Sequence, residues 1–155
     1  MENDEIKLEI KPTFKLLYEF IQNNALTLFI LILLTIPIIQ MKMILVYIIV
    51  LVIYIVFVIL NLLYKYYRYK GMDYIFYQDK LIYTDQFFHK KEKEIKYEDI
   101  KEIRYSQTFL ERFFKIGTII INTNSGNFLY NGIEIPKVDE LKENFDKIRE
   151  VIDRK

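Results

Sequence analysis

The sequence predicts two joined parts, a membrane helical hairpin and an α+β domain. From Ala25 to Leu63 the chain carries a single formal charge, Lys42, whereas the flanking segments are dense in charge. From Met72 onward, short runs of β-branched and aromatic residues alternate with turn residues. The final segment repeats apolar residues with helical spacing. We therefore expect a small β-barrel or paired antiparallel sheets of about six or seven strands, capped by a C-terminal helix.

The composition argues against several classes of function. The 155 residues include 22 Lys and Arg against 21 Asp and Glu, for a net charge of +1, whereas a nucleic-acid binder needs a basic surplus. The chain has no Cys and one His, so it lacks the ligands for disulfides, thiolate chemistry or a His-based metal site. No Gly-rich phosphate loop or nucleophile–base pair is visible, and His89 lies in a charged run. We predict no catalytic, cofactor-binding or metal-binding residues, no nucleic-acid partner and no small-molecule substrate.

The apolar run is too long for one membrane crossing. As a single helix, Ala25–Leu63 would extend about 58 Å, at about 1.5 Å per residue, against a hydrocarbon core of about 30 Å. Pro37 lies near the end of the first half, and the polar Gln40–Lys42 interrupts the run. The predicted spans are therefore about 21–39 and 43–63, joined by a tight turn from which Lys42 snorkels. A cleaved signal peptide would be shorter, with a small-residue cleavage site. A buried hairpin would need a larger protein around it.

Charged and aromatic flanks predict the orientation. The second span ends in a run of cations and tyrosines, typical of a cytoplasmic membrane edge. We call it the collar: Tyr64, Lys65, Tyr66, Tyr67, Arg68, Tyr69 and Lys70. A lipid-headgroup or nucleic-acid patch is the alternative interpretation. Residues 1–20 form a predicted cytoplasmic flank with an amphipathic helix that Thr13 caps. The protein is thus expected to be a multi-pass protein of the cytoplasmic membrane, with both termini in the cytoplasm.

Residues 71–155 form the predicted cytoplasmic domain. Turns are expected at Gln78–Lys80 and Asn124–Gly126. The charged stretch His89–Glu94 is expected to be a solvated hairpin tip, with contact to anionic headgroups as the alternative. Glu98 and Asp99 are adjacent and do not converge on one face, which favours a turn or cap role. The predicted strands are Asp73–Tyr77, Leu81–Phe88, Ile95–Tyr97, Ile100–Thr108, Gly117–Thr123 and Asn127–Ile135.

The C-terminal segment predicts an amphipathic helix with Pro136 in its first turn. Its apolar stripe is Val138, Leu141, Phe145, Ile148 and Ile152.

An aromatic loop between the strands is the most unusual local feature, and it allows two interpretations. Its residues of interest are Phe109, Leu110, Arg112, Phe113 and Phe114. In one interpretation the apolar side chains plug the end of the barrel, while Arg112 satisfies carbonyls or a carboxylate. In the other, some aromatic side chains are exposed and bind a partner or dip into the membrane interface.

Together these residues resemble the bacterial pleckstrin-homology (YdbS-like) membrane protein family. The resemblance lies in Tyr97–Ile100, Ile103, Ser106-Gln107, Leu110–Ile119, Ile121, Gly132-Ile133 and Pro136. The order of parts is also similar: a short flank, two spans and one domain. The resemblance implies a pleckstrin-homology-like fold, cytoplasmic placement and membrane residence, and it carries over no catalytic residue. Phosphoinositide-binding members of the wider superfamily use a basic loop between the first two strands. Here that connection is only Gln78–Lys80, a departure from the pattern.

Two functions follow as hypotheses. The first is a non-enzymatic, membrane-anchored interaction module that binds a protein partner or its own copies at the cytoplasmic membrane face. The alternative is a module that senses anionic lipid or envelope stress at the membrane surface. An enzyme is the third class we considered, and the sequence offers no group of residues to support it.

Overall fold

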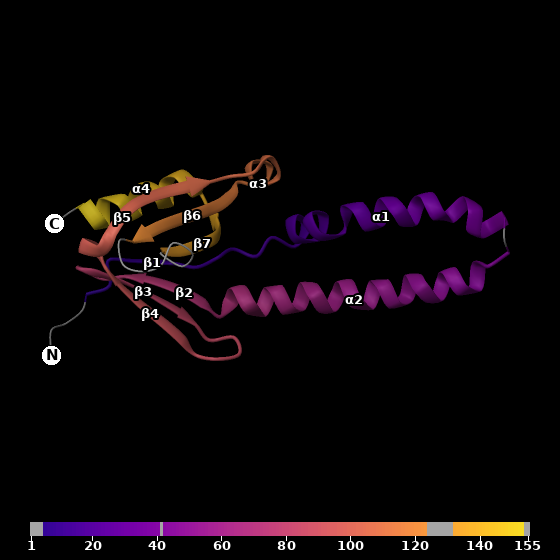
Figure 1. Ribbon diagram of the computed structural model, residues 1–155, viewed down its shortest axis with the longest axis horizontal. Coiled ribbons are helices and arrows are strands. Elements are labelled where there is room, and N and C mark those ends of the chain that lie inside the picture. Colours follow the sequence, from indigo (N-terminus) through magenta and orange to yellow (C-terminus); the bar gives the residue numbers. More distant parts are fainter. Residues whose placement is uncertain (1–4, 41, 124–131, 154–155) are drawn as a thin grey trace. The chain divides into compact units, whose positions relative to one another are not determined.

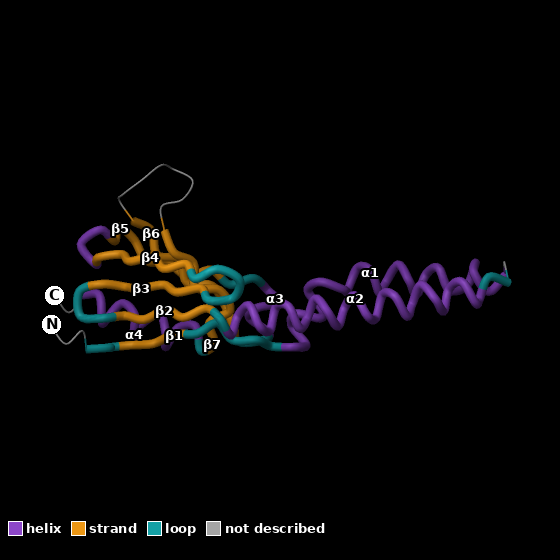
Figure 2. Tube along the Cα trace, turned by 90° about the horizontal axis from the view of Figure 1, so that it is seen from below, coloured by secondary structure: helices purple, strands orange, loops and turns teal. Residues whose placement is uncertain are grey.

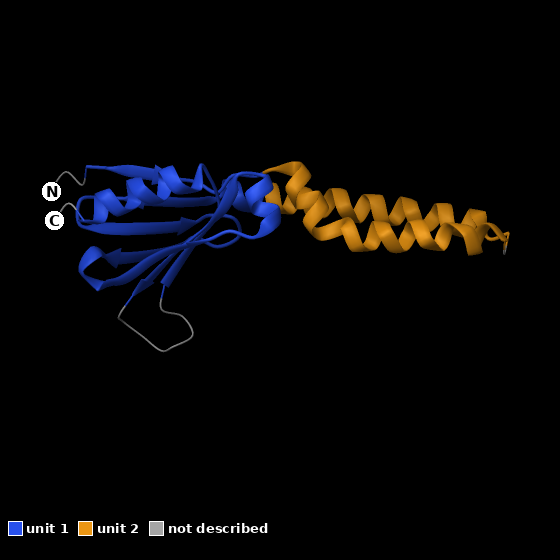
Figure 3. Cartoon of the chain, turned by 90° about the horizontal axis from the view of Figure 1, so that it is seen from above, with its two compact units in different colours: residues 1–14, 67–155 blue, residues 15–66 orange. Residues whose placement is uncertain are grey.

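The computed structural model describes residues 5–40, 42–123 and 132–153. Its internal contacts divide the chain into two compact units, coloured separately in Figure 3. Unit 1 comprises Met1–Phe14 and Tyr67–Lys155, and unit 2 comprises Lys15–Tyr66. The turn expected at Asn124–Gly126 and the first part of the strand expected at Asn127–Ile135 lie outside the described residues, and the rest of that strand lies in a strand from Gly132 to Asp139.

Unit 2 is an antiparallel pair of helices, α1 (Leu16–Gln40) and the greater part of α2 (Ile44–Lys70). By length and composition, both helices are long and apolar enough to cross a membrane. As predicted, the break between them follows Gln40. Hydrogen bonds join the helices along their length. The Tyr47 hydroxyl donates to the Leu31 carbonyl (2.9 Å), and the Tyr54 hydroxyl donates to Asn24 Oδ1 (3.0 Å).

Unit 1 contains two antiparallel sheets, shown in Figures 1 and 2. The first has the order β1-β2-β3-β4 and the second the order β5-β6-β7. Their strands are β1 (Leu8–Ile10), β2 (Met72–Phe76), β3 (Lys80–Asp85), β4 (Lys91–Lys96), β5 (Ile100–Ser106), β6 (Ile116–Thr123) and β7 (Gly132–Asp139). The short helices η1 (Tyr97–Asp99) and α3 (Phe109–Phe113) connect strands, and α4 (Leu141–Asp153) ends the fold. Within the described residues no ladder joins the two sheets, so of the two predicted arrangements the paired sheets are confirmed.

Strand β1 was not predicted, although it belongs to the first sheet. Leu8 pairs with Phe76 and Ile10 pairs with Tyr74, so a strand that precedes α1 lies beside the strand that follows α2. The expected helix cap at Thr13 is wrong. Helix α1 begins at Leu16, and the Thr13 N–H donates instead to the Lys137 carbonyl (2.9 Å). Three residues of strand are too short for periodicity to reveal.

The core of unit 1 forms between the inward faces of the two sheets. Met72, Tyr74 and Phe76 alternate inward along β2, as the pleat of a strand requires. The Tyr74 hydroxyl donates to the Glu134 carbonyl (2.8 Å) and so ties the first sheet to β7. Burial, followed by the neighbouring Tyr83 and acidic groups, raises the Tyr74 pKa well above its usual range. On α4, Leu141 and Ile148 complete this core.

Three sequence predictions for unit 1 need correction. Pro136 lies inside β7 rather than in the first turn of a helix, and α4 begins at Leu141. Because β7 is an edge strand with a register shift at this point, a residue without an N–H is tolerated there. The charged tip is also shorter than expected, since β4 begins at Lys91. An edge strand accepts such charges because its outward face meets water. Tyr97 opens η1 instead of ending a strand.

Candidate functional site

Helix α3 is the aromatic loop of the sequence, and a capping box fixes its first turn. The Thr108 N–H and hydroxyl both donate to Glu111 Oε2, at 2.8 and 3.0 Å. In return, the Glu111 N–H donates to the Thr108 hydroxyl (3.3 Å). These reciprocal bonds satisfy donors that a helix terminus otherwise leaves unpaired. The helix is therefore held in one orientation despite its five residues.

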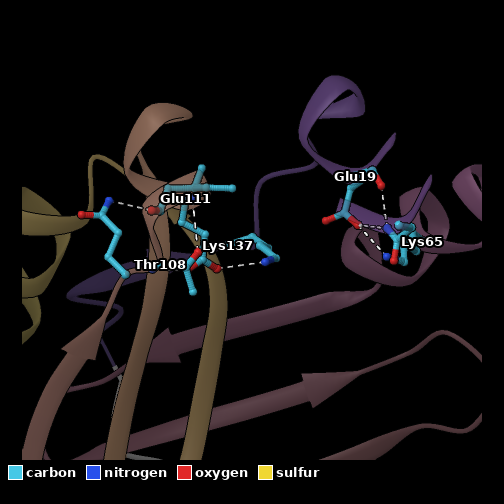
Figure 4. Close-up of polar contacts among 8 residues, drawn as sticks. Glu19, Lys65, Thr108, Glu111 and Lys137 are labelled. Carbon is cyan, nitrogen blue, oxygen red and sulfur yellow. Dashed lines mark hydrogen bonds and ion pairs between the residues drawn. The ribbon is translucent and has the colours of Figure 1, made fainter. Parts of the chain in front are cut away.

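A buried ion pair joins α3 to the second sheet, as Figure 4 shows. Lys137 Nζ lies 2.9 Å from Glu111 Oε1, and the two side chains are only 12% and 8% exposed. Burial alone would raise the pKa of Glu111. Hydrogen bonds from Thr108 and Lys137 outweigh it and hold that pKa below its ordinary value. Lys137 reaches this position from the irregular part of β7, with a left-handed φ of 54°.

In the interpretation in which the loop plugs the barrel, Arg112 makes the charged contact. In the structure Arg112 is exposed, and Glu111 is the buried charged residue of α3. Phe109 and Phe113 are exposed rather than plugging the sheets, whereas Leu110 and Phe114 are half-buried. The interpretation with exposed aromatic side chains therefore fits the structure. The spacing of Thr108 and Glu111, three residues apart, is a capping-box signal that could have identified Glu111 in the sequence.

A second exposed aromatic lies on the connection between β3 and β4. Phe88 packs edge-on against Phe87, with ring centroids 4.3 Å apart, and remains 75% exposed. The Phe87 N–H donates to Asp85 Oδ1 (3.0 Å). The Gln86 N–H donates to the Gly71 carbonyl (2.9 Å), directly after α2 ends. This connection is therefore fastened to the end of α2 inside unit 1.

The collar residues do not share one environment. Lys65 forms an ion pair with Glu19 across the helical hairpin, at 2.7 Å, as Figure 4 shows. Tyr69 packs against the core of unit 1 and lies 6.4 Å from Phe14, measured between ring centroids. The remaining collar residues are exposed: Tyr64, Tyr66, Tyr67, Arg68 and Lys70. Lys42 is also exposed, in the turn between the helices.

Glu19 is a residue that the sequence analysis missed. It lies in the first turn of α1, is 1% exposed, and has the Asn23 amide 3.5 Å from its Oε2. The predicted first span, about 21–39, begins after this residue and so leaves it out. Since α1 begins at Leu16, the helix includes this carboxylate. The signal available in the sequence was a single glutamate placed shortly before a long apolar run.

An open groove of about 350 Å³ runs between β5 and α4. Apolar side chains line it, together with charges of both signs. The lining residues are Ile100, Lys101, Glu102, Ile103, Phe145, Arg149, Ile152 and Asp153. Strand β5 is an edge strand of its sheet and pairs with β6. In the part of the chain that the structure describes, no strand pairs with its other edge, which lies beside a partly apolar hollow. Across the part of the chain that the structure describes, no group of three or more metal-ligating side chains converges.

Comparison with known proteins identifies the family. The family model described as bacterial PH domain matches residues 25–149, which is most of the chain. No curated protein and no solved structure matches the sequence. The match includes much of α1, all of α2, the strands β2 to β7 and much of α4, in agreement with the resemblance seen in the sequence. This chain belongs to the bacterial PH domain family.

Proposed function

We propose that this protein is a non-enzymatic, membrane-anchored interaction module. Its helical hairpin, with spans at about 21–39 and 43–63, anchors it in the cytoplasmic membrane. Its pleckstrin-homology-like domain binds a protein partner, or a second copy of the chain, at the cytoplasmic face. The family match supports an interaction module for proteins or lipids, since domains of this family are typically not catalytic.

The pairing of β1 with β2 supports the two-span topology. These adjacent strands precede α1 and follow α2, respectively, and they lie in one sheet. Both ends of the hairpin must therefore emerge on the same side of any membrane that it crosses. The cations at Lys7, Lys11, Arg68 and Lys70 favour the cytoplasmic side, by the positive-inside rule.

The groove between β5 and α4 carries the proposal of partner binding. An edge strand beside a half-apolar hollow is a surface to which an extended segment of a partner can add a further strand. The register shift between Ile100 and Glu102 lies at one end of this edge. Such irregularity discourages unspecific pairing while leaving the rest of the edge available.

Single-cysteine variants test the anchor, because the natural chain has no cysteine. Lys42→Cys should react with an impermeant maleimide added to intact cells. Gln78→Cys, in the turn between β2 and β3, should react only after the membrane is permeabilised. Reaction of both variants in intact cells, or of Gln78→Cys alone, would refute the proposed topology.

Photocrosslinking in native membranes tests the groove. A benzophenone amino acid at Ile103 should form an adduct, while the same group at the exposed Gln78 should not. An adduct of twice the mass of the chain would identify a second copy, and other masses would identify a different partner. If Ile103 gives no adduct and the protein is a monomer in gentle detergent, partner binding at this groove is wrong.

A second candidate function is the sensing of anionic lipid or envelope stress. The exposed cations Lys90 and Lys91, beside Phe88, favour it. Placing the full chain in nanodiscs of neutral or anionic lipid and measuring solvent protection of residues 86–91 would test it. Equal protection in both lipids would exclude recognition of headgroup charge.

A further inference from the structure

Three exposed phenylalanines lie on two connections that are far apart in the sequence. Phe88 is 75% exposed, Phe109 87% and Phe113 76%. Among the described residues that follow Gly71, Tyr105 is the only other large apolar side chain that is exposed, at 45%. We call Phe88, Phe109 and Phe113 the phenylalanine face. A soluble domain gains nothing by presenting such side chains to water, so they indicate a contact surface.

Both connections are fastened beside the two points where the chain leaves unit 1 for the helices. Through Gln86, the Phe88 connection is bonded to Gly71, the residue after α2. Through Glu111, α3 is paired with Lys137, whose carbonyl accepts the Thr13 N–H shortly before α1. Figures 1 and 2 agree that α3 and the β3–β4 connection lie at the same end of unit 1. The two connections, one from each sheet, are therefore held at that end of unit 1 (Figure 1).

The side chains around this face carry charges of both signs, which is compatible with a membrane interface and does not select one type of lipid headgroup. Exposed cations accompany the phenylalanines at Lys90, Lys91, Arg112 and Lys115, while the carboxylate of Glu111 is turned inward. Acidic groups are also near, however. Glu92 lies 3.6 Å from Lys90, and Glu140 and Glu143 line a hollow with Arg112 and Lys115. Insertion of apolar rings, with cations at the headgroup level, is the interaction that this mixture favours.

We propose that the phenylalanine face inserts into the interface of the same bilayer that the helical hairpin crosses. This inference rests on the proposed function, because it needs the hairpin to be an anchor. The bilayer is the occupant because Gly71 directly follows α2 and Thr13 lies just before α1, so the membrane surface is within reach of both connections. Insertion of the phenylalanine face into the bilayer would leave the groove between β5 and α4 open to a partner. The groove lies along the first half of β5, from Ile100 to Ile103, whereas α3 follows the opposite end of that strand.

The experiment uses single tryptophans, since the natural chain has none. The full chain is placed in nanodiscs of phosphatidylcholine and phosphatidylglycerol, without brominated lipid and with two kinds of it, one brominated close to the headgroup for the face and one brominated deeper in the acyl chain for the span. Phe88→Trp, Phe109→Trp and Phe113→Trp report on the face. Gln78→Trp, at the opposite end of β2 from Gly71, is the aqueous control, and Phe57→Trp, exposed on α2, is the control for the span. Four of the five substitutions replace one exposed aromatic side chain with another, and the fifth replaces the exposed Gln78, so the fold should be retained.

Brominated lipid should quench the three face tryptophans and shift their emission to shorter wavelength, while Gln78→Trp should show neither effect. Quenching at Phe57→Trp without quenching at the face would refute the inference, while the proposal that the hairpin is a membrane anchor would still hold. Absence of quenching at Phe57→Trp would refute the anchor itself. Blue-shifted but unquenched emission from the face would mean that protein covers it rather than lipid, which also overturns the inference.

Discussion

Removal of the buried Lys137 ammonium should destabilise unit 1 far more than removal of a charge from an exposed ion pair. In Lys137→Met, the Glu111 carboxylate loses the cation that lies 2.9 Å away, in a site where both side chains are about nine-tenths buried. Breaking a fully buried pair costs about 3–5 kcal/mol. The N–H and hydroxyl of Thr108 still donate to the carboxylate, so we expect about 2–3 kcal/mol here.

Urea denaturation of the full chain in a mild detergent measures this loss. Near-ultraviolet circular dichroism of the buried Tyr74 and Tyr97 follows the unfolding of unit 1. With a slope of about 1 kcal/mol per molar urea, the midpoint should fall by about 2–3 M. Lys147→Met is the matched control, because it removes the same charge from an exposed pair with Glu143 on α4. Its midpoint should not change measurably. Equal shifts in the two variants would refute the argument from burial.

The same pair predicts a dependence on pH. The Glu111 pKa is lowered in the folded protein. The stability that this carboxylate contributes is therefore fully present above its ordinary pKa of about 4.3 and is lost as the pH falls through the folded value. The difference in unfolding free energy between the natural chain and Lys137→Met should shrink on acidification. A difference that stays constant into that acid range would contradict the role of the charged pair.

Three further predictions concern packing, the hairpin and alkaline pH. Gly117→Ala should cost about 1–3 kcal/mol in the same urea assay, because its new Cβ would lie 2.5 Å from Leu141 Cδ2 and 3.0 Å from a backbone oxygen. Lys65→Met should make the hairpin easier to unfold in titrations with dodecyl sulfate, because Glu19 is left buried without its cation. Adding Glu19→Gln should restore part of that loss, and no recovery would argue against the pair. Burial raises the Tyr74 pKa, so stability should be lost above about pH 10, where the unfolded phenol ionises. Tyrosinate absorbance from this ring that appears before unfolding would contradict this.

The parts that sequence reasoning predicted correctly are those with long, repeated patterns. The length of the apolar run predicted two helices, and the polar residues at Gln40–Lys42 predicted the break between them. The run of β-branched residues in Gly117–Thr123 predicted β6, which begins one residue earlier, and every second side chain of this strand enters the core. The stripe through Leu141 and Ile148 predicted α4 for the corresponding reason.

The parts that were missed depend on contacts between distant residues. Nothing local marks Leu8–Ile10 as a strand, because its partner β2 lies beyond both helices. The charged stretch was expected to be a hairpin tip and Pro136 to begin a helix, but most of that stretch and Pro136 lie in strands that pair at sheet edges. Glu111 finds Lys137 only after α3 and β7 have come together. The exposure of the phenylalanine face likewise depends on how the sheets and helices pack, so the local sequence does not reveal it.

Strand β1 has a consequence for the biosynthesis of the chain. Ile10 pairs with Tyr74, so the first sheet cannot close until the ribosome has made both helices and the start of β2. At about 5–20 residues per second, the N-terminal strand must wait roughly 3–13 s for its partner. During that interval a nascent Leu8–Ile10 remains an unpaired edge. A shortened gene product that begins at Gly71 never acquires this strand, and it would present the bare edge of β2 to other chains.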